Sequence, residues 1–318
     1  MSEKEGSFLE IGGFDEVVKK VNLIDEKMVS RFVAPNEFEF VARNPIEVQF
    51  KQEKEFFCLS DWALGQYLSL TGTRMSMSYA RQQLLYNRQD LLVANLEAFP
   101  LAPKIWTFRL YNDLVVGILS PSYQHYRSIE FLDDILASLI DGSGIWRVIT
   151  SDVSEWGIST YLVEEKTFFR DFHLGLKFVN SEVGLSSIGA SITLFTPSNR
   201  KIVFEGISNV SFLHQAHKGK YSMREKICFM LEQIPLVADK IQQAIVDADK
   251  PIDLEKELLF LTKAVKLSDK RKEELLSKFK LGKLTLNQFL EKTLEFSENL
   301  PLLREDFEKY AGQRLTRV

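Results

Sequence analysis

Residues 145–213 carry the strongest constraint on the fold, because this stretch reads as one strand after another with only short turns between. Six segments combine β-branched, aromatic and alternating apolar residues, and glycine, asparagine, aspartate or proline separates them. The predicted strands are Trp146–Ser151, Trp156–Val163, His173–Asn180, Gly189–Thr196, Lys201–Phe204 and Val210–Leu213. Such short connections favour an antiparallel sheet, and a helix of about 25 residues, from Ser222 to Ala248, is predicted to follow it.

The segments on either side of this stretch extend the prediction to an α+β fold with an antiparallel sheet core and flanking helices. Before it, we expect helices over 14–28, 61–70, 73–98 and 128–139, with strands over 31–58 and 104–119. After Pro251 the strand signals stop and only amphipathic helices follow. We therefore predict a flexible N-terminus over 1–13, an α+β core domain over 14–249 and a small all-helical C-terminal region over 250–318.

The composition is that of a globular protein, and its net charge does not favour binding to nucleic acid. The 318 residues are 45% hydrophobic and 26% charged, with a formal net charge of −4. Any nucleic-acid site must then be a local patch on a mildly acidic body. The only cysteines, Cys58 and Cys228, do not form a metal or redox spacing and suit a reducing compartment. The acidic N-terminus and the lack of a long apolar run predict a cytoplasmic protein without a membrane partner.

The common sequence motifs of nucleotide and metal enzymes are missing. The chain contains no GxxxxGK[ST], GxSxG, HExxH or CxxC, and no GxGxxG after a strand. This favours a protein that needs no cofactor and is not an enzyme, although scattered residues can still assemble a catalytic site.

The stretch Trp62–Gln89 has no aspartate or glutamate but holds arginines and tyrosines at seven-residue intervals. The residues in register are Arg74, Arg81 and Arg88, and Tyr79 and Tyr86. On one continuous helix, the arginines would form a stripe roughly 20 Å long. Such a stripe could bind successive phosphates while the tyrosines stack on bases. Alternatively, the arginines pair with acids from elsewhere in the fold and the tyrosines are half-buried.

A second basic region covers residues 200–226. It contains Arg200, Lys201, Lys218, Lys220 and Arg224, together with Tyr221. Cations interleaved with rings suit a phosphate backbone and stacked bases. The alternative is a solvated loop and helix start.

A metal site is a third hypothesis. His214 and His217 form an HxxH spacing that could share a helical face, and Glu182 could act as a remote ligand or general base. The alternatives are a solvated polar loop for the histidines and a structural turn for Asn180–Gly184, where asparagine and glycine tolerate positive φ.

Four phrases along the chain resemble one protein family. They are LSDWALGQYLSLTG (59–72), VVGILSPSYQHYRSIEFL (115–132), FHLGLKFVNSEVG (172–184) and TLNQFLEKTLEFSENLPLLREDFEKYAG (285–312). They are similar to the phage- and plasmid-borne family filed as domain of unknown function nine hundred and thirty-two. The chain departs from it at Ser198-Asn199-Arg200, where family members commonly have a Cys-Thr-Asn-Gly-like turn, so no role of that cysteine carries over.

This resemblance implies an origin in mobile DNA, near replication and recombination functions. The predicted order of elements is also similar to that of the ring-forming single-strand annealing proteins of recombination, which need no nucleotide cofactor. We therefore predict a protein that binds single-stranded nucleic acid without ATP, takes part in strand annealing and forms a homo-oligomer in the host cytoplasm. The alternatives are a phage structural, assembly or host-interaction protein and a metal-dependent enzyme.

Overall fold

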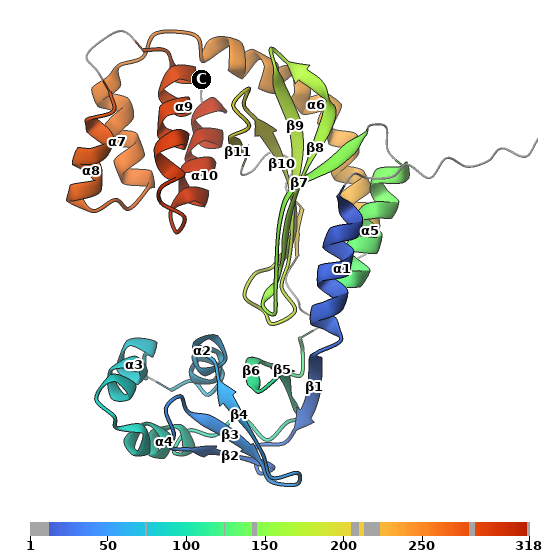
Figure 1. The fold of residues 1–318 in the computed structure, drawn as a ribbon, viewed down its shortest axis with the longest axis vertical. Helices are drawn as coiled ribbons and strands as arrows, with labels where there is room; N and C mark the ends of the chain where they lie inside the picture. The colour runs from blue at the N-terminus through green and yellow to red at the C-terminus, as the bar shows by residue number, and fades with distance from the viewer. Residues whose placement is uncertain are drawn as a thin grey trace, which may run out of the picture.

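The computed structural model describes residues 13–73, 75–123, 125–141, 145–204, 210–212, 223–279 and 284–316. It shows two lobes, each built around its own sheet, on a curved molecule (Figure 1). Helices and mostly antiparallel sheets occur in both, so the predicted α+β class is confirmed.

The small lobe holds a six-stranded sheet in the order β1-β5-β6-β4-β3-β2. Only the β4–β6 pair is parallel. The strands are β1 (Met28–Val33), β2 (Phe38–Val41), β3 (Glu47–Phe50), β4 (Glu55–Leu59), β5 (Trp106–Tyr111) and β6 (Leu114–Leu119). The helices are α2 (Asp61–Leu70), α3 (Met77–Leu85) and α4 (Gln89–Glu97).

Aromatic side chains fill the core of the small lobe. The Phe108 ring lies 5.0 Å from that of Phe38 and 5.5 Å from that of Phe50, and the Phe40 ring meets Tyr67 edge-on at 4.8 Å. Edge-on contacts of this kind add to the energy of burying the rings.

The large lobe is built on the sheet predicted from residues 145–213, in the order β11-β10-β9-β8-β7 with β12 beside β10. All its pairings are antiparallel. The strands are β7 (Trp146–Ser154), β8 (Gly157–Phe169), β9 (Phe172–Asn180), β10 (Ile188–Phe195), β11 (Lys201–Val203) and β12 (Val210–Phe212). The predicted strands therefore all form, at nearly the predicted positions.

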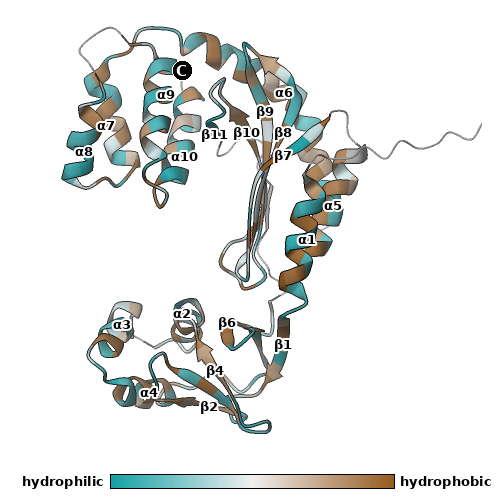
Figure 2. Ribbon diagram, viewed as in Figure 1, coloured by the Kyte–Doolittle hydropathy of each residue, from teal (hydrophilic) through white to brown (hydrophobic). Residues whose placement is uncertain are grey.

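Helices from three parts of the chain complete the large lobe. They are α1 (Phe14–Asp25), α5 (Ser128–Asp141) and α6 (Met223–Asp247), followed by α7 (Leu254–Ala264), α8 (Asp269–Leu276), α9 (Leu286–Ser297) and α10 (Arg304–Leu315). α1 and α5 lie side by side (Figure 1). The chain passes from α1 into β1 of the small lobe and returns from β6 to α5. Figure 2 shows hydrophilic and hydrophobic residues along α1, whose buried residues Phe14, Val17 and Val21 share one side.

The described hydrophobic residues form two large cores. One core runs from Val33 to Ile118, within the small lobe. The other joins α1, the second sheet and the C-terminal helices, from Phe14 to Leu315. The C-terminal helical region contacts the sheet through α10, which packs on β11. Residues 1–12 of the predicted flexible N-terminus lie outside the described residues.

The prediction of one helix over 73–98 is wrong. The segment forms α3 and α4, separated by Tyr86, Asn87 and Arg88. Asn87 adopts a left-handed conformation with φ of 53°, which ends α3, and Arg88 begins α4 from a non-helical conformation. Asparagine is one of the few residues that enters this region at low cost, which explains why the helix breaks there.

Several predicted helix signals are confirmed. The Ser60 side chain caps α2 by accepting a hydrogen bond from the Ala63 amide, and Thr285 with Gln288 forms the predicted capping box of α9. Among the described helices, none combines the length and apolar content that crossing a membrane requires.

Candidate functional site

The turn between β9 and β10, residues 181–184, connects the two lobes. Gly184 has φ of +73°, so the predicted structural turn is confirmed. Two side chains of α2 hold its backbone, since Trp62 Nε1 and Gln66 Nε2 donate to the Val183 carbonyl at 3.0 and 2.8 Å. The buried Val183 packs over Gly117 of β6, where an added Cβ would lie 3.0 Å from the Val183 Cβ. We call this contact the junction.

Glu182 extends from the same turn into a buried polar cluster. Its Oε2 accepts from Arg109 Nη2 at 2.7 Å and lies 2.8 Å from His125 Nε2, and its Oε1 accepts from the Ser128 amide at 2.7 Å. Burial alone would raise the pKa of Glu182, but the hydrogen bonds from His125 and Ser128 and the charge of Arg109 lower it to about 2. Glu182 is therefore a fixed anion that holds groups from both lobes.

Arg109 is the small lobe's contribution to this cluster. Its guanidinium is 5% exposed and also donates to Ser30 Oγ at 2.6 Å, which ties β5 to β1. Burial lowers the pKa of Arg109, and the Glu182 carboxylate opposes that shift. A buried arginine of this kind needs its carboxylate partner.

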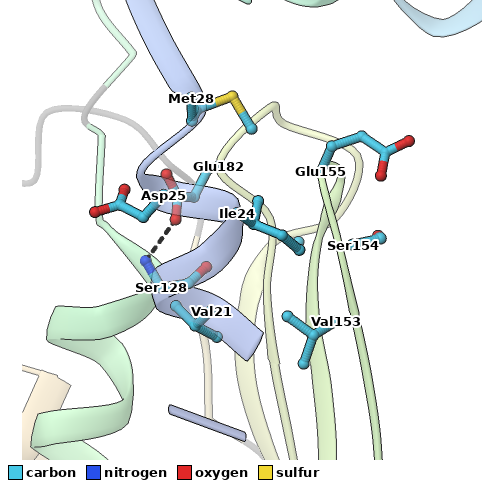
Figure 3. A pocket seen from close by; sticks show the side chains of 10 residues that line it. Val21, Ile24, Asp25, Met28, Ser128, Val153, Ser154, Glu155 and Glu182 are labelled. Carbon is cyan, nitrogen blue, oxygen red and sulfur yellow. Dashed lines mark hydrogen bonds between the residues drawn. The ribbon is translucent and has the colours of Figure 1, made fainter. Parts of the chain in front are cut away.

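The space around Glu182 is nearly filled. Figure 3 shows the pocket beside it, between the end of α1 and the turn after β7, with Asp25, Ser128 and Glu155 among the lining residues. Its cavity volume is about 10 Å³, which is room for about one water molecule. The Glu182 cluster is therefore a packed contact and not a binding site for an organic ligand.

A much larger groove opens on the other side of the junction. It has a volume of about 770 Å³ and lies over α2, the start of α3 and the end of β6. We call it the α2–α3 groove. The residues that line it are Asp61, Trp62, Gly65, Gln66, Ser69, Leu70, Met77, Arg81, Ile118, Leu119, Ser120, Tyr123 and Gly184.

Three of the four phrases that carry the family resemblance meet at this groove and the junction. Residues 59–72 contain Trp62 and Gln66, and residues 115–132 contain Tyr123. Residues 172–184 contain the turn to which Trp62 and Gln66 donate hydrogen bonds. The Tyr123 hydroxyl also donates a hydrogen bond to this turn, to the Ser181 carbonyl at 2.8 Å. Burial raises the pKa of Tyr123, so the hydroxyl remains a donor at neutral pH.

The predicted arginine stripe does not run along one helix, because Arg81 lies on α3 and Arg88 is the N-cap residue of α4. Arg81, on α3, lies at the rim of the groove, and its Nε donates to Asp61 at 2.9 Å with both side chains more than half exposed. Pairing with an acid, the alternative considered from the sequence, thus holds for Arg81. Arg88 is exposed at the start of α4, and Arg74 lies outside the described residues.

The two tyrosines of that segment differ in exposure. Tyr79 is half-buried, and its hydroxyl accepts a hydrogen bond from Asn95 Nδ2 at 3.2 Å. Tyr86 is 62% exposed. Only Tyr86 therefore presents its ring freely to the surface.

In the second predicted basic region, Arg200 and Lys201 contact the C-terminal helices. Arg200 pairs with Glu291 at 2.5 Å and Glu298 at 2.9 Å, and Lys201 Nζ lies 3.6 Å from Glu308 and 3.9 Å from the centre of the Tyr161 ring. Acids of α9, its C-cap and α10 therefore pair with both residues. Arg224 lies in the first turn of α6, and Lys218, Lys220 and Tyr221 lie outside the described residues.

The metal hypothesis receives no support from the described residues. They contain no group of three His, Cys, Asp or Glu side chains that could hold an ion, and Glu182 already faces Arg109. His214 and His217 lie outside the described residues.

Sequence reasoning did not single out Trp62, Gln66 or Arg109. A signal existed for Arg109, because it is a lone cation in the apolar strand WTFRLY. For Trp62 and Gln66 the only signal was their place in a phrase of the resemblance.

Comparisons of the chain with protein-family models, curated proteins and solved structures gave no match. The resemblance described above stays a prediction.

Proposed function

We propose that this protein binds single-stranded nucleic acid without ATP, through the face of the small lobe formed by α2 and α3. The observation that carries the proposal is the coincidence of a 770 Å³ groove with the acid-free segment Trp62–Gln89. Figure 1 shows α2 and α3 together on the side of the small lobe nearest the large lobe.

Local charge supports a polyanionic ligand. Segment 62–89 contains three arginines, no lysine and no acid, so its formal charge is +3 in a chain whose total is −4. The ion pair with Asp61 does not prevent Arg81 from binding a phosphate. A pair between exposed groups contributes only about 0–1 kcal/mol, so a phosphate can replace the carboxylate. Arginine also binds phosphate through two nitrogens at once.

Rings near these arginines support bases as the second part of the ligand. Trp62 and Tyr123 line the groove, and Tyr86 is exposed at the end of α3. Proteins that bind single strands combine such rings with cations, since every base has a face on which a ring can stack.

The experiment is fluorescence anisotropy with a labelled single strand of about ten nucleotides, at about 50 and about 200 mM salt, with unlabelled duplex as competitor. We expect the affinity for the single strand to fall as the salt concentration rises. We expect the unlabelled duplex to displace the labelled strand only weakly. A ribo-oligonucleotide of the same sequence, titrated in parallel, identifies the preferred sugar. Absence of binding at the lower salt concentration contradicts the proposal. Strand annealing and a homo-oligomer remain predictions from the sequence.

A further inference from the structure

Gly65 lies in the middle of α2 and opens onto the α2–α3 groove. Glycine destabilises a helix interior relative to alanine, so its presence there calls for a reason. Packing does not supply one: a Cβ at Gly65 would meet only Met77 Cγ and Sδ, each at 3.5 Å, which is ordinary van der Waals contact. The missing side chain leaves space in the groove.

The lining of the groove mixes apolar and polar side chains. Apolar side chains of Leu70, Met77, Ile118 and Leu119 line it, and the hydroxyls of Ser69 and Ser120 lie among them. Such a mixture suits a heteroaromatic base, which has apolar faces and hydrogen-bonding edges.

The two aromatic residues of the groove are held in place by their polar ends. Trp62 Nε1 donates to the Val183 carbonyl at 3.0 Å, and the Tyr123 hydroxyl donates to the Ser181 carbonyl at 2.8 Å. Their rings are therefore positioned before a ligand arrives, which reduces the entropy cost of binding. Because both bonds end on the 181–184 turn, a ligand in the groove contacts side chains whose positions depend on both lobes.

We propose that the α2–α3 groove binds an unpaired base of the single strand, and that Arg81 at its rim binds the adjoining phosphate. This inference rests on the proposed function and adds to it the part of the ligand that enters the groove. It requires that the base itself, and not only the phosphate chain, contributes to affinity.

The test combines a change in the ligand with a change in the groove. The ligands are a deoxythymidine strand of about ten nucleotides and an abasic strand of the same length, which keeps the phosphates but lacks the bases. The variants are Gly65→Leu, which adds a large side chain to the wall of the groove on α2, and Gly65→Ala, a control that adds only the methyl group that fits against Met77. Both replacements favour the helix, so thermal unfolding should show midpoints at or above that of the wild type.

We expect the wild type and Gly65→Ala to bind the deoxythymidine strand about tenfold more tightly than the abasic strand, as stacking of one base predicts. In Gly65→Leu this ratio should fall to about one while binding of the abasic strand is unchanged. Equal binding of the two strands by the wild type, or an unchanged ratio in Gly65→Leu, overturns the inference and leaves phosphate binding intact. If neither strand binds the wild type, the proposed function itself fails.

Discussion

Glu182 and Glu308 are both buried carboxylates at contacts between parts of the molecule, but their surroundings act on them in opposite ways. Glu182 has a guanidinium, an imidazole and a backbone amide within 2.8 Å, and these lower its pKa to about 2. Glu308 lies 3.6 Å from Lys201 Nζ and 3.2 Å from Arg304 Nε. Burial raises the pKa of Glu308, and the charges of Lys201, Arg304 and Lys177 do not overcome that shift.

This difference separates a contact that stabilises the fold from one that is close to balanced. Removing a carboxylate from water costs several kcal/mol, and only short, well-aligned hydrogen bonds offset that cost. Glu182 meets the condition at the junction. Glu308 does not meet it where α10 packs on β11, and burial also lowers the pKa of its partner Lys201. Apolar side chains of the C-terminal helices also belong to the core of the large lobe.

Glu182→Gln should have the largest effect on stability. A folded pKa of about 2 against an ordinary value of 4.5 corresponds to on the order of 3 kcal/mol at pH 7. Because the folded pKa is depressed, this contribution is present above pH 4.5 and is lost as the pH falls toward 2. Urea unfolding of both proteins at pH 7 and at about pH 3 measures it. An equal difference at the two pH values would contradict the role of the Glu182 charge.

The double variant Lys201→Met with Glu308→Gln removes the charged pair where α10 packs on β11. It should change the free energy of unfolding little. Both charged forms are disfavoured by burial, so we expect the double variant to be as stable as the wild type or up to about 1 kcal/mol more stable at pH 7. The same urea titration checks this. Arg109→Met with Glu182→Gln is the matched variant at the junction, and a loss as large in the Lys201 variant as in this one would remove the distinction between the contacts.

Local sequence signals predicted most of the elements. The strands of the large lobe followed from alternation and turn residues, and the start of α2 and the capping box of α9 followed from Ser60, Thr285 and Gln288. The break between α3 and α4 could have been found from Asn87, since asparagine in a left-handed conformation is a common end of a helix.

The candidate site was predicted only in part, because it depends on contacts between distant residues. Arg109 and Glu182 are 73 residues apart, and Arg200 meets Glu291 from a distance of 91 residues in the chain. Neither spacing leaves a local pattern. The acid-free segment around Arg81 did point to the α2–α3 groove. The basic region around Arg200 and Lys201 gave no sign of their acidic partners, Glu291, Glu298 and Glu308, which lie about a hundred residues further along the chain.

The most direct test of the proposed nucleic-acid face is the salt dependence of single-strand binding after removal of its exposed cations. Arg81→Ala with Arg88→Ala removes two exposed cations of the acid-free segment, and Arg43→Ala with Arg170→Ala removes two exposed, paired arginines elsewhere. Each phosphate contact contributes about 0.7 to the slope of log K against log salt for single strands. We predict a slope about 1.4 smaller for the first variant and an unchanged slope for the second. Equal slopes for wild type and both variants would contradict binding through this face.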